Sequence, residues 1–394
     1  MPKRYLPITS IWEKDIVSDI FDEKSIKNIH LLPFYRALLK ENASYQKLYD
    51  NYNSTNKNLD LSLFHVEEDS LNWFPHEVQM PLRLKRIITQ GDRFALFTSK
   101  VIKAQTSADR STTKLLIQLQ DGKEVESVIM RHEGRSTLCV SSQVGCKMGC
   151  TFCATGTLGL KGNLTMGEII EQLVYANRLE PIRNCVFMGM GEPLDTSDSV
   201  IKAIRFMTNN TTFKMARHRV TLSTVGVIPA LKKLRKEAPF VTLAVSLHAP
   251  EQKLRETIVP TAKNWHLDDL MKEIDLYLAL DKHKKVFIEY ILLSKINDTI
   301  PVAHQLGQLL QHRNVKVNLI PYNETNLFDY KEPKEEDINN FKDILTNEYN
   351  IFVTIRKHMG RDIDGACGQL ALKSKKSKSC DDVEDLIVPS NSTN

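Results

Sequence analysis

The feature that most constrains the fold of this chain is a regular alternation of strand-like and helix-like segments that begins at about Ser136. Such an alternation predicts an α/β fold with a parallel sheet and right-handed crossovers. Seven short parallel strands predict a full or partial (β/α) barrel, in which the chemistry lies at the carboxyl ends of the strands. The seven strand-like runs are Thr137–Val140, Cys185–Met188, Arg219–Ser223, Val241–Ser246, Val286–Leu292, Lys316–Ile320 and Phe352–Arg356.

A β-hairpin segment is expected before the barrel, over residues 96–135. Thr112–Gln120 and Val125–Met130 are rich in strand-forming residues, and they flank the turn pair Asp121-Gly122. Two such runs around an Asp-Gly pair are typical of a hairpin.

The two ends of the chain differ from the predicted barrel, which covers residues 136–372. Residues 1–95 predict a small helical N-terminal domain, because runs such as His30–Glu41 have a helical pattern. Residues 373–394 combine lysines and acids with few large apolar residues, which is typical of a disordered tail.

Composition limits the class of protein. With 42% hydrophobic and 26% charged residues, the chain is typical of a globular protein, and no apolar stretch is long enough for a membrane helix. The N-terminus lacks an uninterrupted apolar region, so the expected location is the cytoplasm, with an organelle left open. The net charge of +5 is small and barely favours a nucleic-acid partner.

Three of the seven cysteines, Cys146, Cys150 and Cys153, fall within the segment CKMGCTFC. An odd total with such clustering is not a disulfide framework and indicates a metal site or catalysis. Three thiolates can hold three irons of a 4Fe–4S cubane and leave the fourth iron open for S-adenosylmethionine (SAM). Zinc is the main alternative and would need a fourth ligand from elsewhere, such as a histidine. Buried, inert cysteines are the other alternative.

A second motif, Gly189-Met190-Gly191-Glu192-Pro193, follows the predicted strand Cys185–Met188. Glycines allow a ligand to approach the backbone, and a carboxylate beside them can hold an ammonium group. Taken alone the motif could be a simple turn. After a strand that follows the cysteine motif, it is similar to the SAM-binding motif of radical SAM enzymes.

The two motifs are part of a wider resemblance that runs from about Asp121 to Leu372. The chain resembles the RlmN/Cfr family, whose members methylate carbon 2 or carbon 8 of adenine in large-subunit ribosomal RNA. RlmN members also modify some transfer RNAs. Pro193 is similar to the RlmN branch, which implies carbon 2. The segments that carry the resemblance are STLCVSSQVGCKMGCTFC, FMGMGEPL, RVTLSTVGVIP, SLHA, VNLIPYN and DIDGACGQL.

The resemblance implies three catalytic residues. Cys367 matches the cysteine that takes a methyl group from a first SAM, and a second SAM supplies the radical. Cys139 matches the cysteine that releases the product by forming a disulfide with Cys367. Glu126 matches a proton acceptor. From the residues alone, Cys367 could be a buried structural cysteine, Cys139 a packing residue and Glu126 an exposed strand residue.

The resemblance also implies the contacts to SAM and the partners. Gly191 and Glu192 should hold the methionine part. The expected partners are RNA (ribosomal and also transfer RNA) and an electron donor of the flavodoxin or ferredoxin type. The protein is expected to be a monomer that does not bind a membrane. The other expected SAM contacts are Ser223, Ser246, Leu247, His248 and Asn323.

Two other functions compete with an RNA methyltransferase. One is a radical SAM enzyme of another class, such as a protein activase, against which Cys139 and Cys367 argue. The other is a non-catalytic iron–sulfur or zinc protein that binds RNA. It would not cleave SAM, so 5′-deoxyadenosine formed after reduction distinguishes it from an enzyme.

Overall fold

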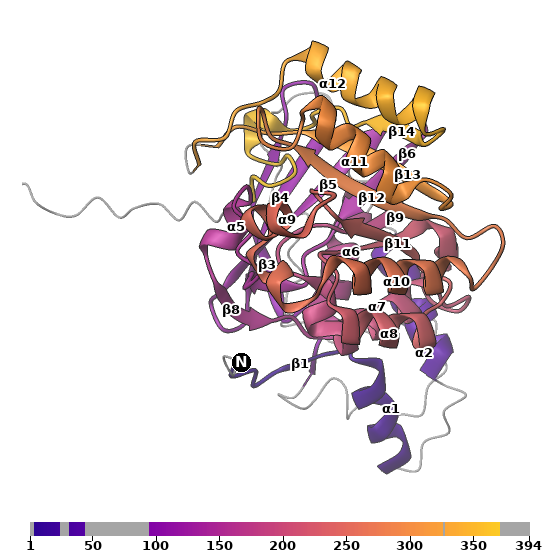
Figure 1. Cartoon of the computed structure of the whole chain (residues 1–394). Helices are drawn as coiled ribbons and strands as arrows, with labels where there is room; N and C mark the ends of the chain where they lie inside the picture. Colours follow the sequence, from indigo (N-terminus) through magenta and orange to yellow (C-terminus); the bar gives the residue numbers. More distant parts are fainter. Residues whose placement is uncertain (1–3, 24–30, 44–93, 326–327, 371–394) are drawn as a thin grey trace, which may run out of the picture.

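The computed structural model describes residues 4–23, 31–43, 94–325 and 328–370, and its centre is a ten-stranded sheet (Figure 1). The order of the strands across the sheet is β14-β13-β12-β11-β10-β9-β6-β5-β4-β3. Their bounds are β3 Ser99–Thr106, β4 Thr112–Leu119, β5 Glu124–His132, β6 Arg135–Cys139, β9 Ile182–Phe187, β10 Val220–Thr224, β11 Thr242–Ser246, β12 Val286–Leu292, β13 Val315–Pro321 and β14 Phe352–Ile355.

The seven strands from β6 to β14 are all parallel, as the alternation predicts. β14 and β3 form the two edges of the sheet among the described residues, so the structure is a partial barrel. The predicted α/β class is confirmed. One strand begins later than predicted, because Arg217–Arg219 form a short 3₁₀ turn and β10 starts at Val220.

The predicted hairpin is part of the same sheet. β4 and β5 pair antiparallel around the Asp121-Gly122 turn, and β5 pairs antiparallel with β6. The sequence analysis missed β3, which adds a further antiparallel strand on the other side of β4. The hairpin therefore extends the parallel sheet at its β6 side.

Helices connect the parallel strands and pack against their neighbours, α6 on α7, α7 on α8 and α8 on α10. In α6, Thr165 and Glu168 form a capping box at the start of the helix. No helix of the described residues is both long and apolar enough to cross a membrane. The connecting helices are α5 Ala154–Thr157, α6 Met166–Leu179, α7 Ser197–Thr208, α8 Ile228–Glu237, α9 Gln252–Ile258, α10 Leu267–Leu278, α11 Ile300–Leu310 and α12 Glu335–Asp343.

The described N-terminal segments pack against this body. α1 Lys14–Glu23 and α2 Leu31–Ala43 are helical, and β1 Thr9–Ser10 pairs with β2 Phe94–Ala95. Trp12 is fully buried and contacts the rings of Tyr35 and Phe206. Residues 44–93 and the predicted tail at 373–394 lie outside the described residues, so the proposed domain limits stay predictions.

Candidate active site

The carboxyl ends of the parallel strands open on one cavity, which we call the cysteine cavity. Most of the predicted site residues line it, although they come from segments far apart in the sequence. This is the position that a parallel α/β sheet gives to its functional residues. The predicted residues that line the cavity are Cys139, Cys146, Cys150, Cys153, Gly191, Glu192, Ser223, Ser246, His248 and Cys367.

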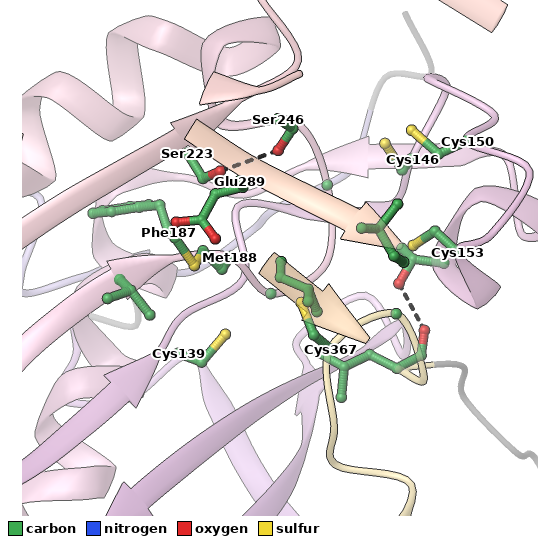
Figure 2. Close-up of a pocket in the computed structure, with 18 of the residues that line it drawn as sticks. Cys139, Cys146, Cys150, Cys153, Phe187, Met188, Ser223, Ser246, Glu289 and Cys367 are labelled. Atoms are coloured by element: carbon green, nitrogen blue, oxygen red, sulfur yellow. Dashed lines mark hydrogen bonds between the residues drawn. The ribbon is translucent and has the colours of Figure 1, made fainter. Parts of the chain in front are cut away.

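The three-cysteine loop connects β7 Gln143–Gly145 to β8 Leu160–Asn163, which pair antiparallel. Gly145 has φ +73°, and a Cβ there would come within 1.9 Å of the Gly159 carbonyl oxygen. The backbone N–H of Cys146 donates to that same carbonyl at 3.1 Å. The narrow base of the loop thus requires glycine, and Figure 2 shows the three thiols together on one side of the cavity.

The donor set of this loop fits a 4Fe–4S cluster with one open iron. Burial raises the pKa of Cys146 to about 12 and also raises the pKa of Cys150, so both are neutral thiols until a metal binds. Within the described residues, no three His, Cys, Asp or Glu side chains converge on a single metal ion. A cubane does not need such convergence, because each thiolate binds a different iron.

The Gly189–Pro193 motif follows β9 and is held against the segment after β6. The backbone N–H of Met190 donates to Ser141 Oγ at 2.8 Å, and that of Glu192 donates to Gln143 Oε1 at 2.9 Å. A Cβ on Gly191 would come within 2.5 Å of the Gln143 side chain. The motif therefore needs glycine for this close packing.

Glu192 is a buried carboxylate on the wall of the cavity. Its two oxygens accept hydrogen bonds from the backbone N–H groups of Leu194 and Val225, each at 2.9 Å. Burial raises the pKa of Glu192 to about 7, and no lysine or arginine of the described chain forms an ion pair with it. An ammonium group in the cavity would favour the ionised form, so Glu192 fits the amino group of SAM.

Three more predicted SAM contacts line the same cavity. Ser223 and Ser246, on β10 and β11, have their hydroxyls 3.2 Å apart (Figure 2). The His248 ring lies edge-on to Phe152 with 4.8 Å between centroids, and its Nδ1 accepts from Ile291 N–H. Burial lowers the pKa of His248 to about 3, so it is a neutral hydrogen-bonding group.

Leu247 and Asn323 lie outside the cysteine cavity. Leu247 is fully buried in the hydrophobic core. Asn323 lines a neighbouring cavity, where its amide donates to the Cys367 carbonyl at 3.1 Å and its Oδ1 accepts from Arg361 at 2.7 Å. Asn323 therefore supports the Cys367 loop from the neighbouring cavity.

Cys139 and Cys367 reach the cysteine cavity from different segments (Figure 2). Cys139 is the last residue of β6 and is buried, whereas Cys367 lies in the loop after β14 and is exposed. Burial raises the pKa of Cys139 to about 12, and the Arg356 guanidinium opposes this shift. The Cys367 loop is joined to the cluster loop, since Ala154 N–H donates to the Gly368 carbonyl at 2.9 Å.

A partly buried ion pair in the same cavity was not predicted from the sequence. Arg356 Nη2 lies 3.1 Å from a carboxylate oxygen of Glu289, which also accepts from the Asn318 amide at 2.8 Å. Both charged residues line the cavity between the two cysteines and the β10–β11 wall. A glutamate inside the apolar strand VFIEYIL was the signal that could have indicated it.

Glu126 is not among the residues that line the cysteine cavity. Val128 and Met130, on the same face of β5, do line it, but Glu126 lies in a separate polar cleft beside Lys114. Its backbone N–H donates to the Met190 sulfur at 3.3 Å, so the strand is joined to the GMGEP segment. The predicted proton acceptor thus lies next to the cavity, on the same face of β5.

Comparisons with known proteins agree with this geometry. The family model of the Radical SAM superfamily matches residues 140–302. The structure is similar to a radical SAM methyltransferase from Sphaerobacter thermophilus, with a TM-score of 0.76, 30% identity and coverage of 92% of this chain and 99% of the other. The fold, the three-cysteine loop and the GMGEP turn define a radical SAM enzyme.

Curated relatives give the family. A probable dual-specificity RNA methyltransferase RlmN from Carboxydothermus hydrogenoformans is 41% identical over 76% of this chain and 87% of its own. The ribosomal RNA large subunit methyltransferase N of Nitrosopumilus maritimus is 36% identical over 82% and 93%. The chain belongs to the RlmN family of radical SAM RNA methyltransferases, which confirms the family predicted from its motifs. Membership implies a 4Fe–4S cluster and SAM as cofactors.

Proposed function

We propose that this protein methylates carbon 2 of an adenine in RNA through a methylated cysteine. The observation that supports this route is that Cys139 and Cys367 line one cavity with the three-cysteine loop. One relative is named a dual-specificity RNA methyltransferase, and another is named a methyltransferase of large-subunit ribosomal RNA. We therefore propose large-subunit ribosomal RNA as the main substrate and transfer RNA as a second one.

The proposal assigns each cofactor to residues that line the cysteine cavity. Cys146, Cys150 and Cys153 would hold the cluster, and Gly191 with Glu192 would hold the methionine part of SAM. When bound, SAM would supply the methyl group, and the cluster with SAM would supply one-electron chemistry at the S-methyl carbon of Cys367. Radical chemistry is needed because carbon 2 of adenine is electron-poor and does not attack a methyl cation.

Cys367 is the proposed methyl carrier. Its thiolate would attack the methyl carbon of SAM, so that an S–CH₃ bond forms, the sulfonium–CH₃ bond breaks and S-adenosylhomocysteine leaves with the electron pair. Cys367 lines both the cysteine cavity and the neighbouring cavity that contains Arg131 and Lys357. A carrier between two cavities can meet SAM on one side and an RNA base on the other, where the exposed Lys357 can attract a phosphate.

Cys139 is the proposed resolving residue. After Glu126 accepts the ring proton, the Cys139 thiolate attacks the sulfur of Cys367. An S–S bond forms, the bond from that sulfur to the methylene carbon breaks, and its electron pair goes to the base, which takes up a proton as a methyl group. The six cysteines of the described chain are all free in the structure, which is the reduced state required at the start.

The test compares three cysteine variants after anaerobic reconstitution with RNA. Cys139→Ala should accumulate RNA that is crosslinked through Cys367, because addition occurs but release does not. Cys367→Ala should form neither product nor crosslink. Cys185→Ala is the matched control, since Cys185 is buried in β9 and does not line the cavity.

A denaturing gel and mass-spectrometric mapping of the crosslinked peptide measure the result. The proposal fails if Cys139→Ala releases methylated RNA at the wild-type rate. Nucleoside analysis should show 2-methyladenosine, and 8-methyladenosine alone would contradict carbon 2. We include in the proposal an electron donor of the flavodoxin or ferredoxin type, a monomeric state and a cytoplasmic location.

A further inference from the structure

A polar cleft lies next to the cysteine cavity, on the same face of β5, and the proposed chemistry leaves most of it unexplained. Lys103 and Gln105 of β3, Lys114 of β4 and the loop at residues 362–364 line it together with Glu126. Buried lysines are rare in protein interiors unless they are paired. Lys114 is 8% exposed, and this burial indicates a specific role.

Lys114 and Glu126 form an ion pair inside this cleft. The Lys114 ammonium lies 3.0 Å from Glu126 Oε1, and the two side chains are 9% and 5% exposed. The other oxygen, Oε2, is buried and has no hydrogen-bond partner among the described residues. Lys114 thus holds Oε1 in position, and Oε2 is left available to accept a proton.

The groups around Glu126 shift its pKa in opposite directions. Burial raises the pKa of Glu126, and Lys114 opposes that rise. Lys103 lies in the same cleft but is exposed, so water screens its charge. The charged groups that face Glu126 from β3, β4, β5 and the C-terminal loop are Lys103, Lys114, Glu124, Asp362 and Asp364.

Lys114 also contacts the loop that carries the proposed methyl carrier. Its ammonium donates to the Asp364 carbonyl at 3.2 Å, and Asp364 lies three positions before Cys367 in the chain. The same loop is held from the hairpin side by Ala108 N–H, which donates to Asp362 at 2.9 Å. One buried cation therefore connects the proposed proton acceptor with the loop of Cys367.

We propose that Lys114 is a positioning residue for the proton transfer: it holds Glu126 as an anion beside the cavity and fixes it relative to the Cys367 loop. The proposal depends on the proposed function, because Glu126 acts only on adenine bound to Cys367. In that step the Glu126 carboxylate accepts the proton from carbon 2, becomes a neutral acid, and leaves the C–H electron pair with the ring.

The experiment isolates this step in the Cys139→Ala background, where the crosslinked RNA stays on the protein. RNA with deuterium on carbon 2 of the target adenine is crosslinked, and loss of deuterium is followed by mass spectrometry across pH 6 to 9. Lys114→Gln should slow the loss at pH 7 by roughly tenfold or more and move its pH midpoint upward, because an unpaired buried carboxylate stays protonated.

Three further variants make the result specific. Lys114→Arg keeps the charge and should stay near the parent rate, and Lys103→Gln, the matched exposed lysine, should leave the pH profile unchanged. Adding Lys114→Gln to Glu126→Gln should have no further effect, because both act on one group. The double variant replaces the ion pair by two neutral amides and leaves no unpaired buried charge. It can therefore be measured even if Lys114→Gln alone does not fold.

The possible outcomes separate the two proposals. An unshifted pH profile in Lys114→Gln, or a slowing that is additive with Glu126→Gln, overturns the role of Lys114. Absence of any crosslink in the Cys139→Ala parent overturns the covalent route itself. Circular dichroism and iron content of each variant confirm that the fold and the cluster are retained.

Discussion

At the scale of single residues, the site is built from groups whose surroundings change their protonation. Glu192 is the clearest case, because a buried carboxylate that accepts from two backbone N–H groups and the Thr224 hydroxyl, but has no cationic partner among the described residues, is poorly compensated. Its pKa of about 7 shows the effect of that burial. A cationic ligand supplies the missing compensation, so ligand binding and ionisation of Glu192 favour each other.

We predict that Glu192→Ala weakens SAM binding by roughly tenfold or more, because truncation of a buried charge partner typically costs several kcal/mol. The variant should keep its iron, since Glu192 is not a cluster ligand in the proposed site. Equilibrium dialysis of the reconstituted protein measures affinity, and iron analysis measures the cluster. Glu335→Ala, on an exposed turn of α12, is the control. Wild-type affinity in Glu192→Ala would contradict the assignment of GMGEP to the amino group.

At the scale of elements, the loop between β7 and β8 depends on its narrow base. We predict that Gly145→Ala loses most of its cluster, because a Cβ there lies within 1.9 Å of the Gly159 carbonyl and the loop must move. Gly149→Ala is a matched control in the same loop: its φ of +65° is also positive, but nothing lies within 4 Å of a Cβ. It should cost only about 1 kcal/mol of backbone strain.

Iron and sulfide content after anaerobic reconstitution distinguishes the two glycine variants. Equal cluster loading in both would show that the base of the loop tolerates displacement. Equal loss in both would show that the positive φ matters more than the close approach.

Helix α6 joins the N-terminal segment to the sheet through Glu171, which is fully buried. Its carboxylate accepts from Ser10 Oγ at 2.6 Å, from Thr98 N–H at 2.9 Å and from the Ser99 hydroxyl. Burial raises the pKa of Glu171 to about 7. The folded state therefore holds a proton at pH values where the unfolded carboxyl has already lost it.

This shift predicts a pH-dependent stability with a defined sign. Between the unfolded pKa near 4.5 and the folded value near 7, the contribution of Glu171 to the free energy of unfolding falls as pH rises. The fall is at most roughly 3 kcal/mol. We compare the free energies of unfolding of Glu171→Gln and the wild type by denaturant unfolding from pH 5 to 8. The difference between them should change with pH up to about 7 and become constant above that value. A difference that does not depend on pH would contradict the raised pKa.

At the scale of the whole molecule, Arg4 joins three distant segments. Its guanidinium lies 2.7 Å from Asp121 at the hairpin turn and 2.7 Å from Glu168 at the start of α6, and it donates to the Asn163 carbonyl beside them. All three charged side chains are at least nine-tenths buried. Arg4 thus connects the β4–β5 hairpin, the two-stranded β7–β8 sheet and helix α6.

We predict that Arg4→Ala lowers the free energy of unfolding by about 3 kcal/mol or more, because two buried carboxylates lose their cation. Lys202→Ala is the control, since its ion pair with Asp15 is about half exposed and should contribute less than about 1 kcal/mol. Thermal or denaturant unfolding measures both. Equal effects in the two variants would show that the Arg4 network does not stabilise the fold.

The sequence by itself determined the features that depend on short stretches of chain. The order of strands and helices, the capping box of α6, the Asp121-Gly122 turn and the spacing of Cys146, Cys150 and Cys153 are local properties. Periodicity and turn chemistry encode them directly, so the α/β class followed from the residues. The functional assignment came from the resemblance carried by these same local motifs.

Only the tertiary structure decided which side chains face which cavity. Leu247 is in the core, Glu126 lies in a polar cleft next to the cysteine cavity, and Asn323 supports the Cys367 loop. The Glu289–Arg356 pair joins strands that the sequence separates widely. The physical reason is that neighbouring residues of a strand point to opposite faces, so a side chain's surroundings depend on strand register and on loops that pack from distant parts of the chain.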